Sequence, residues 1–574
     1  MELIFYDFEV FKHDWLVVFR SQERETIIVN RQDELEVFYQ ENKNNVFVGY
    51  NSRSYDQYIF KGILAGFNPK EINDFIIVQG KKGWEFSDVF NRIQLYNYDC
   101  MPSRYHSLKE LEGFFGSDIK ESDVDFNIDR KLTNEEITET IEYCRHDVEE
   151  TIKVFKETIN NFNSHCEIIK MFRLPVSSIS KTQAQLSATV LKCRRKQYED
   201  EFDFELVNTL DVKKYSNVVE WFLNPDNRNY QSKLKTTVSG CPHIFGWGGL
   251  HGAIDRPVHR KGLIIHIDVQ SFYPSIMITY NLLSRSATNK QMYRDIYNKR
   301  LTLKKAGKKE EQAPYKIILN ATYGICKDKY NAAYDPMSAN AVCVNGQLLL
   351  LDLIEHLENY CELIQSNTDG LIIQIKDSDD AFEKIDDICD EWENRTGMQL
   401  SFDIISEIYQ KDVNNYLWID EDGSVEVKNK YLTGGINMDN NLQIVREAMI
   451  NYMVGKIPPE KTINECDDLI KFQRIVKISR KFLYASHGDA VLRGKTFRIF
   501  ASARKEDPGI FKAKRWVNKD GDEKISNHKI SETSEHVFID NGNVVGKKVS
   551  DRLDKQYYID LTYKRLRDFG IENV

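Results

Sequence analysis

The chain has 574 residues, which is too long for one ordinary hydrophobic core and predicts roughly three or four compact units. Hydrophobic residues make up 41% and charged residues 29%, a globular composition that excludes a disordered chain. The net charge of −10 argues weakly against a nucleic-acid protein. Basic residues nevertheless gather in residues 299–309 and 474–504, and local basic patches can bind phosphate on an acidic protein.

The sequence shows no targeting or membrane segment. Its first residues lack the basic and long apolar regions of a signal peptide, and no run reaches the roughly 18 uninterrupted apolar residues of a membrane span. The ten cysteines are scattered without a Cys-x-x-Cys pair, which favours reduced thiols in a cytoplasm. We therefore expect a cytoplasmic protein without a membrane partner.

Strands alternate with helices up to about residue 180. Residues 3–10 predict a buried strand that ends in carboxylates, and strands are also expected at 15–19 and 46–50. A helical pattern begins near Tyr55, and Thr133 with Glu136 predicts a capped helix that runs through Asp147. This alternation predicts an α/β first domain.

The pattern changes from about residue 260. It predicts a strand at 263–268, a charged helix at 291–306, and a second helix from Pro314 to about Tyr323. Apolar runs at 363–365 and 371–375 flank residues 366–370 and predict a hairpin with a polar tip. The last ~130 residues are mixed and basic, and their pattern predicts no architecture.

Acids stand at informative places in the first domain. Asp7 and Glu9 are two residues apart in a strand, so their side chains share one face. Two such acids repel one another unless a cation lies between them, and phosphodiester hydrolysis uses paired cations. Asp56 and Asp147 could complete this site, and Tyr143, one helical turn before Asp147, could orient the attacking water. For any one acid, a solvated carboxylate at a strand end is the alternative.

A second pair of acids follows the later strands. Asp268 stands at a strand end, where it can hold a metal, and Pro274 suits the start of the following helix. Tyr273 is then placed to lie under a sugar and exclude a 2′-hydroxyl group. Asp369, at the tip of the predicted hairpin, supplies the second acid that a two-metal site requires. The alternative for residues 268–274 is an ordinary turn in which Tyr273 belongs to the hydrophobic core.

One helix face carries a cation, an amide and an aromatic ring. Lys316, Asn320 and Tyr323 are spaced by four and three residues, so they share that face. This combination suits a nucleotide, with phosphate at the lysine and the base pair against the ring. Arg300 could add a phosphate contact, although residues 299–309 fit a solvated hairpin tip equally well.

In this order, the motifs resemble those of family B DNA polymerases with a proofreading exonuclease. Asp7-x-Glu9, Asn51-x-x-x-Tyr-Asp56 and Tyr143-x-x-x-Asp147 resemble the three exonuclease motifs. Residues 268–274, 316–324 and 365–370 resemble polymerase motifs A, B and C. The resemblance covers about residues 5–430 and implies an α/β and α+β multidomain fold, with a ribonuclease H-like exonuclease domain before a right-hand polymerase. The implied parts are the exonuclease domain (1–180), palm (181–284 and 326–435), short fingers (285–325) and thumb or C-terminal region (436–574).

The resemblance also implies roles for individual residues. Two Mg²⁺ or Mn²⁺ ions are expected at each site, and Tyr143 joins the metal ligands as a catalytic residue. The implied ligands are Asp7, Glu9, Asp56 and Asp147 at the exonuclease site, and Asp268, Val269 and Asp369 at the polymerase site. The implied nucleotide-binding residues are Ser271, Phe272, Tyr273, Arg300, Lys316, Asn320 and Tyr323. The implied DNA-binding residues are Asn51, Ser107, Leu108, Gly248, Gly249, Tyr416 and Lys428.

Two positions depart from the family pattern. Asn367 stands where motif C has its first aspartate, and Asn414 stands where the family has a lysine. An asparagine can coordinate or donate a hydrogen bond but adds no charge, so we expect an active site with an altered metal preference. The same departures motivate one alternative, a 3′–5′ exonuclease whose polymerase half is only a DNA-binding scaffold. A non-catalytic replication-initiation or interaction protein is the other.

The size of the chain is similar to that of the small protein-primed phage polymerases. Asp268 and Lys316 lie too close in sequence to leave room for the insertion with which those polymerases hold a terminal protein. The segment from Tyr323 to Asn367 is also short for their second insertion, which encircles the template. We therefore expect a phage or prophage replicase that extends an RNA or DNA primer in the cytoplasm of a bacterial host. Its expected partners are primer-template DNA, dNTPs and possible replication accessory proteins, and the protein is expected to be a monomer.

The C-terminal region has cations between aromatic residues. A thumb that grips the duplex backbone would need such charges. A solvated surface over an ordinary aromatic core explains the same residues. The cations are Lys477, Arg480, Lys481, Arg493, Lys495 and Arg498.

Overall fold

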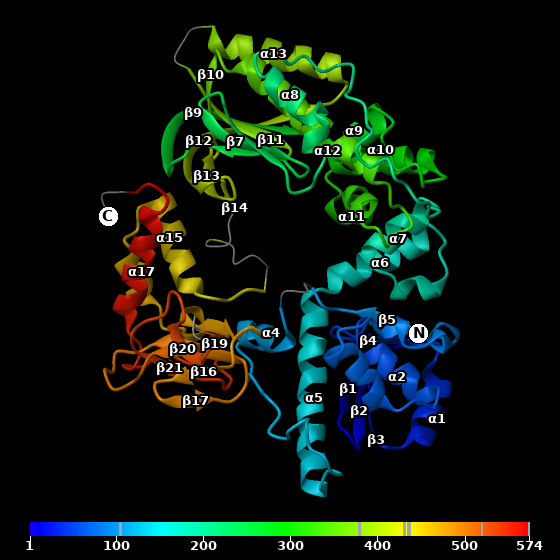
Figure 1. Ribbon diagram of the computed structural model, residues 1–574. Helices are drawn as coiled ribbons and strands as arrows, with labels where there is room; N and C mark the ends of the chain where they lie inside the picture. Colours follow the sequence, from blue (N-terminus) through cyan, green and yellow to red (C-terminus); the bar gives the residue numbers. More distant parts are fainter. Residues whose placement is uncertain (103–105, 377–379, 429–431, 433–437, 518–520, 572–574) are drawn as a thin grey trace. The chain divides into compact units, whose positions relative to one another are not determined.

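The computed structural model describes residues 1–574 except 103–105, 377–379, 429–431, 433–437, 518–520 and 572–574 (Figure 1). The chain divides into two compact units. Unit 1 comprises Met1–Lys181, Ile436–Val445 and Ile463–Ile559, and unit 2 comprises Thr182–Gly435, Arg446–Thr462 and Asp560–Val574. Both units mix helices with sheets, so the expected α/β and α+β multidomain class is confirmed, whereas the division into exonuclease, palm, fingers and thumb stays a prediction.

The first part of unit 1 is a five-stranded mixed sheet with helices on both faces. Its order is β3-β2-β1-β4-β5, with β1 antiparallel to β2 and parallel to β4. The strands are β1 (Leu3–Val10), β2 (Trp15–Arg20), β3 (Glu25–Val29), β4 (Val46–Gly49) and β5 (Tyr96–Asp99). The helices are α1 (Gln32–Asn42), α2 (Asp56–Leu64), α3 (Pro69–Asn73), α4 (Leu108–Phe115), α5 (Asn134–Glu157) and α6 (Ile159–Met171).

The alternation of β1 decides which face its acids occupy. Tyr6 packs with Phe60 of α2, whereas Phe5 packs on the opposite face with residues of α5. Because side chains in a strand alternate between faces, Asp7 and Glu9 lie on the same face as Phe5, toward α5. The long helix α5 runs beside this sheet in Figure 1, and its predicted capping box at Thr133 is confirmed.

The later part of unit 1 contains two further sheets. Strands β15 (Arg474–Lys477), β18 (Thr496–Ala501) and β21 (Val537–Ile539) form one, and β17 (Ala490–Leu492), β16 (Tyr484–His487), β19 (Ile510–Val517) and β20 (Glu523–Lys529) form the other. The chain passes between the two units at five places, and three of these fall within the helices α15 (Gln443–Gly455), α16 (Pro459–Glu465) and α17 (Lys555–Arg567).

Arg498 of β18 is a structural residue. We expected it among the cations of a DNA-binding surface, but its side chain is 0% exposed, so that expectation is wrong. Its guanidinium donates to Gln473 Oε1 at 2.8 Å and to four backbone carbonyl oxygens, those of Gly113, Ser117, Asp540 and Gly542. Burial lowers its pKa to about 10. A guanidinium has five donors, and this site uses them to satisfy buried carbonyl groups.

We predict that Arg498→Met destabilises unit 1 by about 3–5 kcal/mol, because buried carbonyl oxygens lose their donor. Urea unfolding of the full chain should show the change as a lower midpoint for the unit 1 transition. The matched control is Arg480→Met, since Arg480 is exposed, and its effect should stay within about 0.5 kcal/mol. Equal shifts for the two variants would contradict a structural role.

Unit 2 is built on a nine-stranded antiparallel sheet of order β14-β13-β12-β9-β11-β10-β8-β7-β6. In that order, the strands are β14 (Val425–Lys428), β13 (Asn415–Asp420), β12 (Leu400–Asp412), β9 (Val258–Val269), β11 (Gly370–Ile375), β10 (Cys361–Asn367), β8 (His251–Ala253), β7 (Cys241–Gly246) and β6 (Lys233–Val238). The helices are α7 (Gln183–Val190), α8 (Ser216–Leu223), α9 (Phe272–Thr279), α10 (Lys290–Lys305), α11 (Lys309–Lys327), α12 (Pro336–Leu357) and α13 (Ala381–Thr396).

Three predicted elements of unit 2 have clearly different bounds. The strand expected at 263–268 is β9, which begins at Val258. Helix α11 begins at Lys309, and Pro314 lies inside it instead of starting it. A proline there removes one backbone hydrogen bond and crowds the carbonyl group four residues before it, but its φ suits a helix. The packing of α11 against both α7 and α10 offsets this cost. The hairpin tip is two residues instead of five, because Asn367 pairs with Gly370 and extends both strands.

Among the helices of the described residues, α12 alone is long and apolar enough to cross a membrane, yet 94% of its most apolar window is buried. Its buried polar residues have partners within unit 2. Gln347 Nε2 donates to the carbonyl oxygens of Gly246 (2.8 Å) and Gly248 (2.9 Å). This helix therefore serves as a core helix that also holds the glycine-rich segment after β7.

Candidate active sites

The four predicted acids of unit 1 lie together. Asp7 and Glu9 project from β1, and ligand atoms of these two residues lie within 4.8 Å of one another. Asp56, the first residue of α2, accepts a hydrogen bond from the backbone N–H of Phe8 at 3.3 Å. Asp147 faces them from α5, and its charge acts on both Asp7 and Glu9. We call Asp7, Glu9, Asp56 and Asp147 the acid cluster.

The acid cluster is unfavourable as a set of free carboxylates. Burial raises the pKa of Asp56 to about 7 and that of Asp147 to about 6. Burial, and then repulsion from the neighbouring acids, raises the pKa of Asp7 and Glu9 well above their ordinary values. Groups with such shifts are typical of functional sites, and a bound cation would relieve them.

Lys109 is a functional candidate that sequence analysis missed. Its Nζ lies 2.6 Å from Asp147 Oδ1 and 2.9 Å from Glu112 Oε1, and it lies over the ring of Tyr143 at 4.6 Å. Although burial opposes the charge, these two carboxylates raise the pKa of Lys109. The pairing of Lys109 with Glu112 three residues later was visible in the sequence. The contact between Lys109 and Asp147 depends on how α4 packs against α5, and no local sequence pattern predicts that packing.

We predict that, with a chelator present, unit 1 loses stability as the pH rises from about 4 to about 7. The folded-state pKa values of the acid cluster are raised, so the folded state binds more protons than the unfolded chain across this window. The loss is on the order of a few kcal/mol. Melting temperatures at pH 5 and pH 8 in chelator measure this loss of stability. The difference between the two melting temperatures should shrink when Mn²⁺ replaces the chelator. A melting temperature that rises with pH in chelator would contradict the prediction.

The other predicted residues of unit 1 are placed as follows. Burial, and then the charge of Asp147, raises the pKa of Tyr143, so its phenol stays neutral. Asn51 has a left-handed backbone (φ 56°), and its N–H donates to Asp99 Oδ1 at 3.0 Å. Ser107 caps the start of α4 in a capping box with Glu110, and Leu108 is the first residue of that helix. Their contact with DNA stays a prediction.

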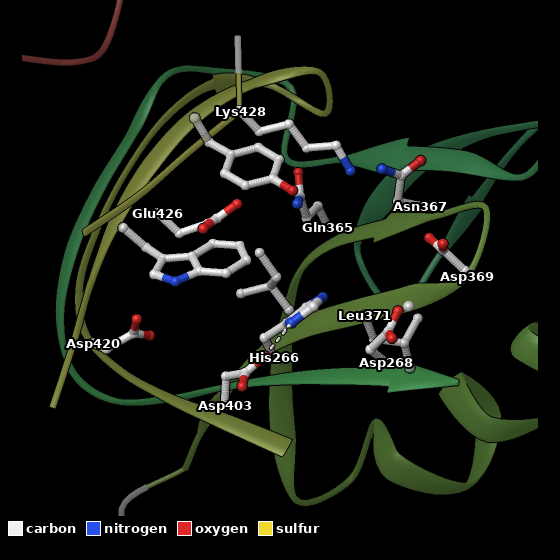
Figure 2. Close-up of a pocket in the computed structure, with 14 residues that line it drawn as sticks. His266, Asp268, Gln365, Asn367, Asp369, Leu371, Asp403, Asp420, Glu426 and Lys428 are labelled. Atoms are coloured by element: carbon white, nitrogen blue, oxygen red, sulfur yellow. Dashed lines mark hydrogen bonds and ion pairs between the residues drawn. The ribbon is translucent and has the colours of Figure 1, made fainter. Parts of the chain in front are cut away.

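Strand register brings the two predicted acids of unit 2 together. Asp268 of β9 is opposite Gly370 of β11, and the N–H of Val269 donates to the carbonyl oxygen of Asp369 at 2.9 Å. A Cβ at Gly370 would lie 2.6 Å from the carbonyl oxygen of Ile267, so only glycine permits this approach. Figure 2 shows Asp268 on its strand and Asp369 at the nearby tip of the hairpin. Burial, and then the charge of Asp369, raises the pKa of Asp268 to about 6.

Two cavities meet at Asp268 and Asp369, and both acids line each of them. The α11 cavity, of about 400 Å³, is otherwise lined by Val269, Ser271, Phe272, Tyr273, Pro274, Leu319, Asn320, Tyr323 and Thr368. The β14 cavity, of about 410 Å³, is otherwise lined by His266, Gln365, Asn367, Gly370, Leu371, Ile372, Asp403, Tyr416, Trp418, Asp420, Glu426 and Lys428. The acid pair therefore stands between two spaces of different composition.

The α11 cavity contains most of the predicted nucleotide-binding residues. Tyr323 of α11 contacts Tyr273 with ring centroids 4.4 Å apart, and Asn320 lines the same space. Lys316 is exposed and Arg300 is partly buried, and neither lines this cavity. The Arg300 guanidinium instead donates to Ser271 Oγ at 2.5 Å. This contact places a cation next to the turn that follows Asp268.

The glycine-rich segment lies against the hairpin tip. A Cβ at Gly249 would lie 2.6 Å from Thr368 Oγ1, so a glycine lets the backbone approach the Thr368 side chain without a collision. Gly248 is held through its carbonyl oxygen by Gln347 at 2.9 Å. Gly249 thus lies against the loop that carries Asp369, whereas Gly248 is anchored to α12, and a direct DNA contact of either residue stays a prediction.

The β14 cavity is rich in acids. Its carboxylates come from four strands and the hairpin tip, and among the described residues that line it Lys428 is the one lysine or arginine. Lys428 is the register partner of Tyr416, and in Figure 2 its side chain extends toward Asn367. His266 contacts Asp403 at 3.1 Å. The sequence pattern did not indicate His266, Asp403, Asp420 and Glu426, because only the register of β9, β12, β13 and β14 brings them together.

No family model matches the chain, and no curated protein matches it. Among the solved structures, the family B DNA polymerase from the hyperthermophilic archaeon Pyrobaculum calidifontis is similar to it with a TM-score of 0.41 and 14% sequence identity. The match covers 100% of this chain and 78% of that chain. A likeness at this level does not assign an activity.

Proposed function

We propose that the chain is a DNA-directed DNA polymerase that also removes nucleotides from a 3′ end. The observation that carries the proposal is the placement of Asp268, near the end of β9, beside Asp369, at the tip of the hairpin whose strand β11 pairs with β9, where two cavities meet. One space can hold an incoming dNTP and the other the primer end, so that both reach the acid pair. The acid cluster of unit 1 supports a separate nuclease site.

The donor sets fit divalent ions. Both sites offer carboxylate oxygens, which are the ligands that Mg²⁺ and Mn²⁺ prefer, and burial makes their free charges unfavourable. We assign two ions to each site, held by Asp268, Asp369 and the backbone of Val269 in unit 2, and by the acid cluster in unit 1. When bound, such ions activate the attacking oxygen and neutralise charge on the phosphate.

The residues of the α11 cavity would position the nucleotide. Tyr323 and Asn320 contact the base pair, and Tyr273 lies under the sugar, where it excludes a 2′-hydroxyl group. Arg300 and Lys316 lie outside the cavity lining and would meet the triphosphate at its edge. The primer 3′-oxygen then attacks the α-phosphate and pyrophosphate leaves.

At the nuclease site, the neutral phenol of Tyr143 would orient the attacking water against a phosphodiester held at the acid cluster. Asn51, Ser107 and Leu108 would guide the frayed single-stranded end. We further propose a phage or prophage replicase that extends an RNA or DNA primer as a monomer in the host cytoplasm, with accessory proteins as possible partners. The compact spacing of motifs A, B and C supports this form.

Primer extension tests the proposal. A recessed-end DNA duplex is incubated with the full chain and Mg²⁺, with and without dNTPs. Extension with dNTPs and 3′ shortening without them would support both activities. Shortening alone would favour the alternative function, an exonuclease with a DNA-binding scaffold, which Asn367 and Asn414 motivate. A primer that is neither extended with dNTPs nor shortened without them would contradict both functions.

We predict that Lys428→Met weakens primer-template binding by about tenfold and leaves kcat within about twofold. Lys428 lines the β14 cavity, where no other lysine or arginine of the described residues does, so its loss removes a cation that would meet a strand phosphate. The slope of log affinity against log salt should fall by about one, and Lys428→Arg should restore it. Lys384→Met, on the exposed surface of α13, serves as the control. An unchanged salt slope would refute the contact.

A further inference from the structure

A second group of possible metal ligands lies beside the acid cluster. Glu112 of α4 is 0% exposed, and His146 and Asp147 of α5 are each 8% exposed. One ligand atom from each residue lies within 4.8 Å of the other two. Glu112 and His146 belong to none of the predicted sites, and Asp147 is shared with the acid cluster.

The ring of His146 points independently to a missing ligand. Its Nε2 is buried and has no hydrogen-bond partner within the described structure, and the nearest carboxylate oxygen, Glu112 Oε2, is 3.7 Å away. Buried ring nitrogens are normally satisfied, so an orphan of this kind calls for an ion or a water molecule. The two carboxylates beside it favour a cation.

Lys109 supplies a positive charge at this place. Its ammonium contacts Glu112 at 2.9 Å and Asp147 at 2.6 Å, which are two of the three candidate ligands. The Lys109 side chain is 13% exposed. A single charge there neutralises only one of the two carboxylates and leaves His146 without a partner.

We propose that Glu112, His146 and Asp147 form a binding site for a transition-metal ion, and that Lys109 fills this site until the ion binds. An imidazole nitrogen with two carboxylates suits Zn²⁺, Co²⁺ or Mn²⁺ better than Mg²⁺, which prefers oxygen ligands. Lys109 then turns to solvent, and His146 gains its partner. Because Asp147 is shared, such an ion draws this carboxylate away from the acid cluster, so Zn²⁺ should slow any reaction at that cluster.

Metal binding tests the site without reference to any activity. Zn²⁺ is titrated calorimetrically into the full chain carrying Asp7→Asn and Glu9→Gln, which removes two ligands of the acid cluster. In this background, His146→Ala should weaken Zn²⁺ binding at least tenfold, because one of three ligands is lost. Lys109→Met should strengthen it by about tenfold, because the competing ammonium is gone. His13→Ala is the control, since His13 is exposed and contacts a single carboxylate.

The two variants have opposite expected signs, which separates metal binding from a general loss of folding. Glu112→Gln is the second ligand variant, and circular dichroism without metal checks that each protein folds. Unchanged Zn²⁺ affinity in the ligand variants, or weaker binding in Lys109→Met, would overturn the proposal.

Anomalous scattering from a Zn²⁺-soaked crystal should place the ion against His146 Nε2. An ion found only between Asp7 and Glu9 of the unmodified chain would also overturn it. Neither result bears on whether the chain extends primers or shortens them.

Discussion

Asp369→Ala should abolish primer extension and leave 3′ shortening intact. Asp369 lies at the two-residue tip between β10 and β11, and Val269 of the adjacent strand holds its backbone. Without its carboxylate, Asp268 faces the two cavities alone and cannot hold a pair of ions. We expect extension to fall by about 10³-fold or more, the order of loss when an enzyme loses a group on which its transition state depends.

Nuclease activity should survive because the acid cluster consists of unit 1 residues only. Single-turnover extension and shortening of the same labelled duplex measure both rates. Asp403→Ala is the matched control, because it removes another carboxylate from the lining of the β14 cavity, one that pairs with His266. The extension rate of this variant should stay within about tenfold of the rate of the unmodified protein. Loss of both activities in Asp369→Ala would argue against separate sites.

Local patterns predicted the parts of the two sites that depend on local geometry. The alternation of a strand places Asp7 and Glu9 on one face, and the hairpin pattern places Asp369 at a turn. The cap at Thr133 was also readable, because a capping box spans only four residues. These features need no knowledge of how distant segments pack.

The rest depends on packing between distant segments. Lys109 reaches Asp147 only because α4 lies against α5, and Glu426 reaches Asp268's cavity only through the register of three strands. Arg498 misled the sequence analysis because composition reports charge and not burial. Asn367 is different. Its Oδ1 accepts the N–H of Thr368 at 2.8 Å and its side chain contacts His251, and because an aspartate could make both contacts, nothing in the structure explains why an asparagine stands here.

Glu9→Gln should remove 3′ shortening and at the same time stabilise unit 1. The carboxylate of Glu9 lies within the acid cluster, so its loss should slow nucleotide removal by about 10³-fold or more. The same group is 8% exposed, and burial, followed by the charge of Asp147, raises its pKa. A neutral amide of the same shape avoids this repulsion. We expect a gain of about 0.5–2 kcal/mol at pH 8 in chelator, the usual range when a strained functional site is relaxed.

The two effects have one cause, and this makes the prediction strict. Carboxylates that are close enough to share ions repel one another when the ions are absent, so activity and chelator stability should change in opposite directions. Shortening rates with Mg²⁺ and urea unfolding with chelator are measured on the same preparation, with Glu139→Gln on the exposed side of α5 as the control. Mg²⁺ should reverse the order of stability, because only the original cluster gains from binding. A Glu9→Gln protein that is inactive and also less stable in chelator would show that Glu9 supports the fold, and that the acids of unit 1 are not held together for metal ions.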